Sequence, residues 1–331
     1  MTLEEIGIRA REVEPVIRVL PTAVKNRVLH KAAENLRMHT EEILRANVLD
    51  MEKGRERGMS AGLLDRLQLT DARVDGMAAG LEALADLEDP VGEVTGMKKR
   101  PNGLLIGQKR VPLGVVGIIY EARPNVTADA FGLCFKTGNA VILKGGSDAI
   151  SSNRAIVEVL KATLEEEGLP GDLLLLIEDT SRETTKAFMK MNRYVDVLIP
   201  RGGAGLIRTV VENSTIPVIE TGTGNCHIFV DESADMEMAA AIILNAKTQR
   251  VGVCNACESL VVHRKVKDAF LPMLARKLSE KQVALRGDEA AREAVPSMKE
   301  ASAEDWGTEY LDYFLSVKTV DSLDEAIAHI N

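Results

Sequence analysis

The sequence predicts an α/β protein with a doubly wound, mostly parallel sheet and a smaller α/β unit after it. Short apolar segments alternate with helical segments from about residue 114 to residue 231, which is typical of βαβ units. A second series of helices and strands starts near residue 232. We therefore expect two domains, over residues 1–231 and residues 232–331.

Composition limits the class of protein. The chain has 331 residues, 45% of them apolar, and a net charge of −9. This length favours more than one domain, and the negative charge argues against general binding of nucleic acid or membrane surfaces. Residues 1–20 lack the apolar core of a signal peptide, and no run approaches 18 apolar residues. The four sparse cysteines are expected to be free thiols in the cytoplasm.

The elements follow in order along the chain. Residues 3–90 show helical spacing of apolar residues, and residues 94–113 predict a hairpin around Asn102-Gly103. The expected strands are 114–120, 140–144, 173–178, 195–200, 216–220 and 227–231. The expected helices are about 125–137, 149–167, 181–191, 203–213, 233–247 and 265–281. A capping box, Ser322 to Glu325, opens a last helix. Because the chain stops at Asn331 before any partner for that helix, we expect a truncated sequence.

Four polar, glycine-rich turns follow predicted strands. They are residues 121–127, 144–148, 200–205 and 220–225. Glycine lets a ligand approach the backbone, and the free N–H groups of a helix start favour phosphate. Parallel strands end at one edge of the sheet, where ligands bind. The G-x-G-x-x-G and Walker A motifs are both absent from the sequence, so a nucleotide would be held by a different loop arrangement.

Cys254 and Cys257 form a C-x-x-C motif with three interpretations. One is a redox pair, one is a zinc site completed by Cys226 and His227, and one is a single nucleophilic thiolate. Neighbours in a strand point to opposite faces, which disfavours a zinc site made with both Cys226 and His227. We favour Cys254 as the nucleophile, with no metal. Such a thiol needs a lowered pKa, for which a helix start, Lys247 or Arg250 are candidate causes.

Four segments resemble the aldehyde dehydrogenase superfamily and, within it, the γ-glutamyl phosphate reductase family. They are residues 120–146, 199–207, 219–231 and 245–263. Glu220 also precedes Cys254 by 34 residues (254 − 220), as the glutamate motif of that superfamily precedes its cysteine. Residues 320–331 resemble the first half of the signature of that reductase family.

The resemblance implies a reaction. It is the NADPH-dependent reduction of L-glutamate 5-phosphate to L-glutamate 5-semialdehyde, the second step of proline biosynthesis, through a thioester on Cys254. The Asn125 side chain and the Cys254 N–H would bind the oxyanion. Glu220 would position the nicotinamide or help to deprotonate Cys254. Arg123 and Asn255 would bind substrate. The cofactor would lie against Lys144, Gly145, Gly146, Ser147, Arg201, Gly202, Gly203, Thr221 and Gly222.

The resemblance also implies that residues 1–231 form an NADP(H)-binding domain and residues 232–331 an incomplete catalytic domain. It implies partners as well. The hairpin at about 95–112 would join subunits of a homo-oligomer, and glutamate 5-kinase would supply the labile acyl phosphate. Two alternatives stay open from the residues alone. One is another cysteine-dependent acyl reductase, such as a CoA-acylating aldehyde dehydrogenase. The other is a zinc-stabilised module without enzymatic activity.

Overall fold

Helices form the start of the chain in the computed structural model, which describes residues 1–222 and 224–331, apart from the Ala61 side chain. Thr2 and Glu5 form a capping box at the first helix. Contact clustering divides the chain into two units, Met1–Thr221 and Gly222–Asn331, and each is described by itself. The first helices are α1 (Leu3–Arg18), α2 (Thr22–Met38), α3 (Thr40–Glu56), α4 (Ala61–Leu67) and α5 (Asp71–Asp86).

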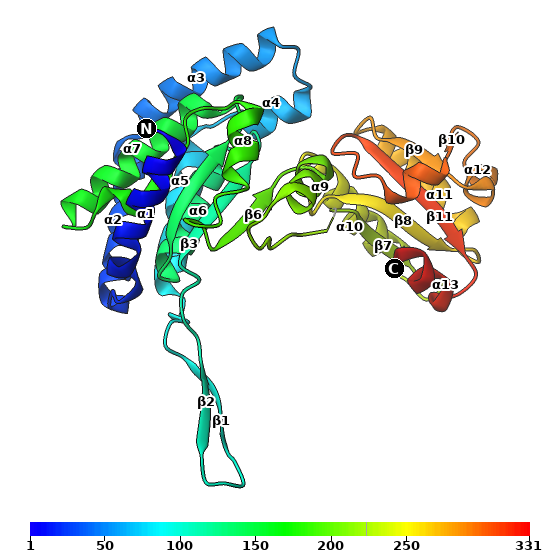
Figure 1. Cartoon of the computed structure of the whole chain (residues 1–331). Helices are drawn as coiled ribbons and strands as arrows, with labels where there is room; N and C mark the ends of the chain where they lie inside the picture. Colours follow the sequence, from blue (N-terminus) through cyan, green and yellow to red (C-terminus); the bar gives the residue numbers. More distant parts are fainter. Residues whose placement is uncertain (223) are drawn as a thin grey trace. The chain divides into compact units, whose positions relative to one another are not determined.

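A parallel sheet forms the core of the first unit (Figure 1). Its order is β5-β4-β3-β6, and β3 and β4 are buried along their whole length. Helices precede or follow each strand, as predicted. The strands are β3 (Val115–Tyr120), β4 (Ala140–Gly145), β5 (Leu174–Leu176) and β6 (Val197–Arg201), and the helices are α6 (Asn125–Lys136), α7 (Ile150–Glu166), α8 (Arg182–Phe188) and α9 (Ala204–Asn213).

The segment predicted as strand 216–220 differs from the prediction. It makes a single bridge, Val218 with Leu198, beside β6. Pro217 has no N–H to donate, so the contacts are the Leu198 N–H to the Pro217 carbonyl at 2.8 Å and the Ile219 N–H to the Leu198 carbonyl at 2.9 Å. The segment still runs along the edge of the sheet and ends at Glu220.

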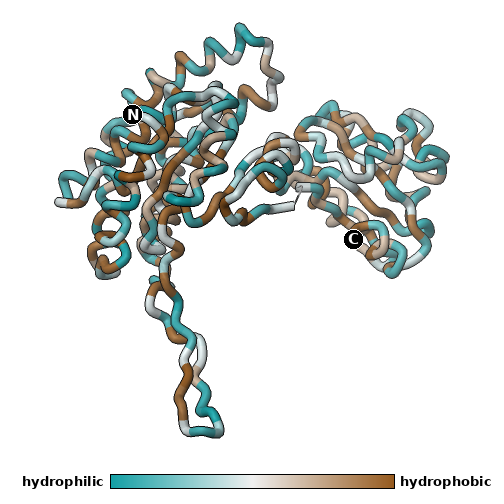
Figure 2. The backbone as a smooth tube through the Cα atoms, viewed as in Figure 1, coloured by the Kyte–Doolittle hydropathy of each residue, from teal (hydrophilic) through white to brown (hydrophobic). Residues whose placement is uncertain are grey.

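The predicted hairpin is present. β1 (Val94–Lys99) pairs antiparallel with β2 (Leu105–Lys109), and every residue of both strands is exposed. It extends away from the helices and the sheet of the first unit, to which it belongs (Figure 1), and Figure 2 shows an apolar stretch along it. The exposed apolar side chains include Met97, Leu105 and Ile106.

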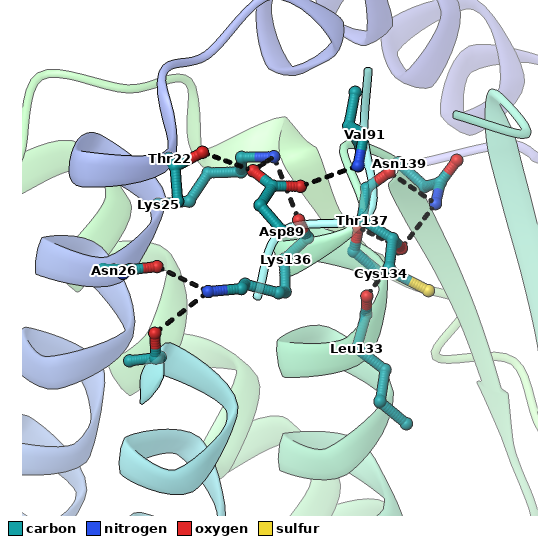
Figure 3. Close-up of polar contacts among 11 residues, drawn as sticks. Thr22, Lys25, Asn26, Asp89, Val91, Leu133, Cys134, Lys136, Thr137 and Asn139 are labelled. Atoms are coloured by element: carbon teal, nitrogen blue, oxygen red, sulfur yellow. Dashed lines mark hydrogen bonds and ion pairs between the residues drawn. The ribbon is translucent and has the colours of Figure 1, made fainter. Parts of the chain in front are cut away.

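Buried polar contacts hold the base of the hairpin (Figure 3). The Lys25 ammonium pairs with the Asp89 carboxylate and donates to the Lys136 carbonyl oxygen at 3.0 Å. Asp89 also accepts from the Thr22 hydroxyl at 2.8 Å and from the Val91 N–H at 3.0 Å. The chain therefore enters the hairpin from a point that is fixed to α2.

The second unit is built on another parallel sheet, of order β10-β9-β11-β8-β7. The sequence predicts its strand β7 at 227–231, before the expected boundary at 231/232. In the structure β7 pairs with β8, so this strand belongs to the second sheet. The function of each domain stays a prediction. The strands are β7 (Cys226–Val230), β8 (Cys257–His263), β9 (Ala284–Gly287), β10 (Lys299–Glu300) and β11 (Phe314–Val320), and the α-helices are α10 (Met236–Thr248), α11 (Lys267–Ser279), α12 (Glu289–Ala294) and α13 (Leu323–Ile330).

The last helix starts where the sequence predicts. The Ser322 hydroxyl accepts from the Glu325 N–H at 3.1 Å, and the Glu325 carboxylate accepts in return from the Asp321 N–H at 2.7 Å. The return bond thus reaches one residue further back than in a standard capping box. Among the described residues, no helix has both the length and the apolar character to cross a bilayer.

Candidate active site

Three of the four predicted turns meet at the carboxyl edge of the first sheet. Tyr120, the last residue of β3, lies opposite Gly145 of β4 and Arg201 of β6 in the two ladders. The turns that follow these strands are therefore neighbours. Because loops at this edge of a parallel sheet bind ligands, the structure gathers the first unit's predicted residues where binding is expected.

Lys144 and Gly145 end β4 in a tight, buried arrangement. The Lys144 side chain is buried, and its ammonium group donates to the Gly145 carbonyl oxygen at 3.3 Å. Burial lowers the pKa of Lys144, and the charge of Asp179 acts in the opposite direction. A Cβ atom on Gly145 would lie 2.4 Å from Nδ2 of Asn153. A side chain here would have to displace the Asn153 amide, so glycine suits this position.

The next two residues complete the turn. The Gly146 N–H donates to the Tyr120 carbonyl oxygen at 2.9 Å, which holds the turn against β3. Ser147 is exposed, and its hydroxyl lies 3.4 Å from a guanidinium nitrogen of Arg57. A buried cation, side-chain-free backbone and an exposed hydroxyl therefore lie together, a donor set that fits the sugar or phosphate end of a nucleotide.

The turn after β6 is held by a carboxylate that the sequence did not single out. Glu121 accepts from the Gly203 N–H at 2.9 Å, at the start of α9. A Cβ atom on Gly202 would lie 2.7 Å from the same carboxylate. A negative charge already faces this helix start, where anions are favoured. Arg201 to Gly203 are therefore better suited to packing beside a cofactor than to holding its phosphate.

Asn125 is the first residue of α6, and the cap position belongs to Pro124, which makes no side-chain cap bond. The Asn125 amide nitrogen donates to the Asp129 carboxylate, one turn further along, at 3.1 Å. Asn125 is exposed, so its second N–H can point to a ligand. Arg123 is half-buried in the turn before the helix, and its carbonyl accepts from the Val126 N–H at 3.0 Å.

A buried polar chain supports this corner. The hydroxyls of Tyr120 and Thr127 lie 2.8 Å apart, and the Thr127 hydroxyl donates to the Asn153 side chain at 3.1 Å. Burial raises the pKa of Tyr120, which therefore stays a neutral phenol. These bonds join β3, α6 and α7 beneath the turns and fix the start of α6.

A cavity of about 570 Å³ opens beside the same helix. Its walls are mostly apolar, and Asp129 and Arg201 are its charged members. The lining includes Ile118, Val126, Asp129, Leu133, Ile199 and Arg201. Apolar surroundings raise the pKa of Asp129, while the bond from Asn125 and the charge of Arg201 act to lower it.

The fourth turn follows the bridge at Val218. Glu220, Thr221 and Gly222 are exposed. Thr223 lies outside the described residues, so the motif is described only in part. Gly224 belongs to the second unit, and there a Cβ atom on it would lie 2.7 Å from Cβ and from the carbonyl oxygen of Cys254. The turn therefore needs glycine at this point to approach the predicted nucleophile.

Cys254 lies in the turn between α10 and β8 and is half-buried, while Asn255 beside it is exposed. The turn is closed by the Ala256 N–H, which donates to the Val253 carbonyl oxygen at 3.1 Å. The Cys226 thiol also contacts the Cys254 carbonyl oxygen at 3.4 Å. A backbone hydrogen bond and the Cys226 thiol thus hold the predicted nucleophile in a turn rather than in a strand.

The second cysteine of the C-x-x-C motif differs from the first. Cys257 is buried in β8, and burial raises its pKa to about 12. It therefore stays a thiol, which argues against a redox pair. Lys247 pairs with Glu258 at 2.6 Å, and both side chains are fully buried. The Lys247 charge is thus compensated by Glu258 rather than directed at Cys254.

The zinc alternative gains no support from the geometry. Nδ1 of His227 lies 2.8 Å from the Asn225 carbonyl oxygen. Over residues 1–222 and 224–331, no group of three or more His, Cys, Asp or Glu side chains is placed to hold a metal ion.

Three residues near these turns were not predicted: Glu121, Asp129 and Gly224. Glu121 is the first residue of one predicted turn, and Gly224 lies in another. The sequence therefore indicates where both residues lie, but not what they contact. Asp129 lies at i+4 from Asn125, which is the spacing of helix neighbours. The contacts of Glu121 and Gly224 are made with other parts of the chain. The hydrogen bond from Asn125 to Asp129 depends on where α6 begins.

The sequence is similar to a family of enzymes and to individual members of it. The model of the aldehyde dehydrogenase family matches residues 2–307. A γ-glutamyl phosphate reductase of Lachnospira eligens is 57% identical over all of this chain and 80% of its own length. That of Agathobacter rectalis is 59% identical over 99% of this chain and 79% of its own.

Solved structures of similar proteins have the same fold. The crystal structure of γ-glutamyl phosphate reductase from Thermotoga maritima has a TM-score of 0.89 and 48% identity, covering 99% of this chain and 79% of its own. A propionaldehyde dehydrogenase from Rhodopseudomonas palustris, with propionyl-CoA bound, has a TM-score of 0.70 but only 18% identity. It covers 99% of this chain and 77% of its own length, and supports the fold alone.

Proposed function

The chain belongs to the aldehyde dehydrogenase family and resembles its γ-glutamyl phosphate reductases at 53–59% identity, and on this premise we propose that it reduces L-glutamate 5-phosphate to L-glutamate 5-semialdehyde in proline biosynthesis. The observation that carries the proposal is the match to these reductases, which covers 99–100% of this chain and 79–80% of their own length. NADPH as the hydride donor and a thioester on Cys254 are finer parts of the same proposal.

Cys254 is the proposed nucleophile because it is half-buried in a turn, while Cys134 and Cys257 are buried thiols with raised pKa values. Its sulfur attacks the acyl carbon, and phosphate leaves with the bonding electrons. The result is a thioester, which hydride then reduces to a thiohemiacetal. Its collapse releases the aldehyde and returns the thiolate.

The acyl oxygen carries negative charge in both steps, so hydrogen-bond donors lower the barrier. We assign this role to the Asn125 amide and the Cys254 N–H. Asn125 is suited to it because Asp129 accepts one of its N–H groups and fixes the side chain. Loss of one such donor typically costs about 3 kcal/mol of barrier, roughly a hundredfold in rate. Arg123 and Asn255 are proposed to bind the rest of the substrate.

Glu220 has two proposed roles: it positions the nicotinamide or accepts the Cys254 proton. It is exposed at the end of its segment and is therefore accessible to either. A water-activating role is excluded by the chemistry proposed, since hydrolysis of the thioester would return glutamate. A Glu220→Gln variant with full turnover would remove both roles.

The cofactor residues fit a nicotinamide dinucleotide. Lys144 to Ser147 present a buried ammonium group, backbone without side chains and an exposed hydroxyl. We propose that they hold the adenosine ribose and its 2′-phosphate, and that Arg201 to Gly203 with Thr221 and Gly222 pack beside the cofactor. When bound, NADPH supplies the hydride.

We also propose a homo-oligomer joined through the hairpin, and a cytoplasmic enzyme. An isolated two-stranded hairpin is marginal in water, and this one exposes apolar side chains along both strands. Four free cysteines fit a reducing compartment. Glutamate 5-kinase is the proposed source of the acyl phosphate, because that compound is labile and must be used where it is made.

The reverse reaction tests the proposal. Glutamate semialdehyde, phosphate and NADP⁺ are mixed with the wild type, with Cys254→Ser and with the control Cys226→Ser, and NADPH formation is followed by absorbance. We expect phosphate-dependent activity that falls at least a thousandfold in Cys254→Ser and is kept in Cys226→Ser, as roughly expected for loss of a nucleophile.

Two other outcomes would contradict it. Activity that requires CoA in place of phosphate would indicate a CoA-acylating dehydrogenase. Activity that survives in Cys254→Ser would remove the covalent step.

A further inference from the structure

We propose that Asp129 binds the α-ammonium group of the substrate and so selects amino-acid aldehydes and acyl phosphates over analogues without the amino group. The inference deepens the proposed function and rests on it, because it places the acyl oxygen at Asn125. It assigns Asp129 as a specificity-determining residue.

Asp129 lies within reach of the amino group of a substrate whose acyl oxygen is bound at Asn125. The Asn125 amide nitrogen lies 3.1 Å from the Asp129 carboxylate. A substrate oxygen bonded to the other N–H of the same amide would lie about 3 Å from that nitrogen. In an extended glutamyl chain, the amino nitrogen lies about 5 Å from the acyl carbon, from bond lengths near 1.5 Å. A substrate held at Asn125 can therefore bring its ammonium group within hydrogen-bond distance of Asp129.

The surroundings are the second argument. Asp129 lines the cavity of about 570 Å³ together with the apolar side chains of Val126, Leu133, Ile118 and Ile199. Such walls suit the methylene groups between the two ends of the substrate. The cavity thus offers an apolar wall with a carboxylate beside it, which matches a short chain that carries a cation.

The state of the carboxylate is the third argument. Within the described residues, no Lys, Arg or His nitrogen lies within 4.0 Å of the Asp129 carboxylate. Its side chain reaches solvent, but apolar surroundings still raise its pKa. The carboxylate is exposed, and the charge of Arg201 favours its ionised form. Asp129 is therefore an anionic side chain at the cavity wall that is accessible to a cationic ligand.

A simpler role competes with this one. Asp129 accepts a hydrogen bond from Asn125 and could act only by orienting that amide. Loss of such a positioning residue would slow the reaction of every substrate alike. Loss of an ammonium-binding residue would slow only substrates that carry the amino group. Substrate comparison therefore separates the two roles.

The experiment uses the reverse reaction with phosphate and NADP⁺. Two aldehydes are compared, glutamate semialdehyde and 5-oxopentanoate, which has the same carbon chain and carboxylate without the amino group. The enzymes are the wild type, Asp129→Asn, Asp129→Glu, Asn125→Ala and Asp71→Asn. Asp71 is an exposed carboxylate in the first turn of α5 and serves as the control. Part of the semialdehyde cyclises, but this affects every enzyme equally.

We expect the ratio of kcat/KM for glutamate semialdehyde to that for 5-oxopentanoate to fall about tenfold to a hundredfold in Asp129→Asn, the range for loss of one charged substrate contact. Asp129→Glu keeps the charge and should keep part of the ratio. Asn125→Ala should lower both values and leave the ratio within about twofold.

An unchanged ratio in Asp129→Asn, whether both values fall or neither does, would overturn the proposal. Circular dichroism and thermal unfolding establish that each variant is folded, and Asp129→Ser, which also removes the charge, carries the comparison under the same criterion if the asparagine variant is not folded. Wild-type enzyme that forms no NADPH from either aldehyde would instead contradict the proposed function itself.

Discussion

At the scale of single residues, Lys144 is the clearest case of a side chain whose setting costs stability. Its ammonium group is buried at the end of β4, with a carbonyl oxygen at 3.3 Å as its hydrogen-bond partner. Burial lowers the pKa of Lys144, which shows that the charged form is disfavoured there. Such a cation is stabilised when an anion binds beside it, and the 2′-phosphate of NADPH is the anion proposed.

Replacement of Lys144 by methionine tests this. We expect KM for NADPH to rise about tenfold or more, KM for NADH to change less, and the free energy of unfolding to stay the same or increase, because an apolar side chain replaces a buried charge. Steady-state kinetics and urea unfolding measure the three quantities. Lys186→Met, at an exposed position on α8, is the control. An unchanged NADPH KM would remove Lys144 from the cofactor site.

Single residues also show where sequence reasoning ends. Lys144 and Gly145 could be predicted because a cation and glycine directly follow an apolar strand. Glu121 could not, because its role depends on the Gly203 N–H, 82 positions away in the sequence. The role proposed for Asp129 could not be predicted either, because it depends on a cavity wall that includes residues of β3 and β6. Local patterns identify turns, but partners from distant elements give side chains their function.

At the scale of elements, the alternation of strands and helices was predicted well, and pairing was not. Strands β3 to β6 and helices α6 to α9 lie close to their predicted bounds. The segment 216–220 has an apolar pattern, but Pro217 cannot complete a ladder and leaves a single bridge. Strand β7 has an apolar pattern like that of the strands before it, yet it pairs with β8. Apolar patterns specify that a strand forms, whereas packing decides which sheet it joins.

The base of the hairpin gives a pH prediction at this scale. Burial alone raises the pKa of Asp89, but hydrogen bonds from Lys25, Val91 and Thr22 outweigh it and leave the pKa lowered (Figure 3). A lowered folded-state pKa means that the carboxylate stabilises the fold above its unfolded value of about 3.9. That contribution is lost as the pH falls through the still lower folded-state value.

Asp89→Asn should therefore lower the free energy of unfolding by about 3 kcal/mol at neutral pH, since it leaves the Lys25 ammonium buried without its partner. The difference from wild type should shrink below about pH 4. Urea unfolding from pH 3 to pH 7 measures it. The exposed neighbour Glu88 provides the control Glu88→Gln. A difference that stays constant across this range would contradict the assignment.

At the scale of the whole molecule, the exposed hairpin is the feature that supports the proposed homo-oligomer. Its strands are exposed on every residue, and their outer edges leave backbone groups unpaired. Lys99 lies opposite Leu105 and Lys98 opposite Ile106, so each face carries both charge and apolar surface. Leu105 is 58% exposed, so the proposed contact with another subunit would remove its apolar surface from water.

Leu105→Glu should therefore weaken assembly without affecting the fold of the first unit, because the hairpin packs outside the core. We expect sedimentation velocity to show a smaller species than the wild type at the same micromolar concentration, with the main thermal transition unchanged within about 2 °C, as for surface substitutions. Asn102→Ser, in the turn at the tip, should leave the assembly intact. If Leu105→Glu sediments like the wild type, the subunits associate through another surface and the hairpin has no part in joining them.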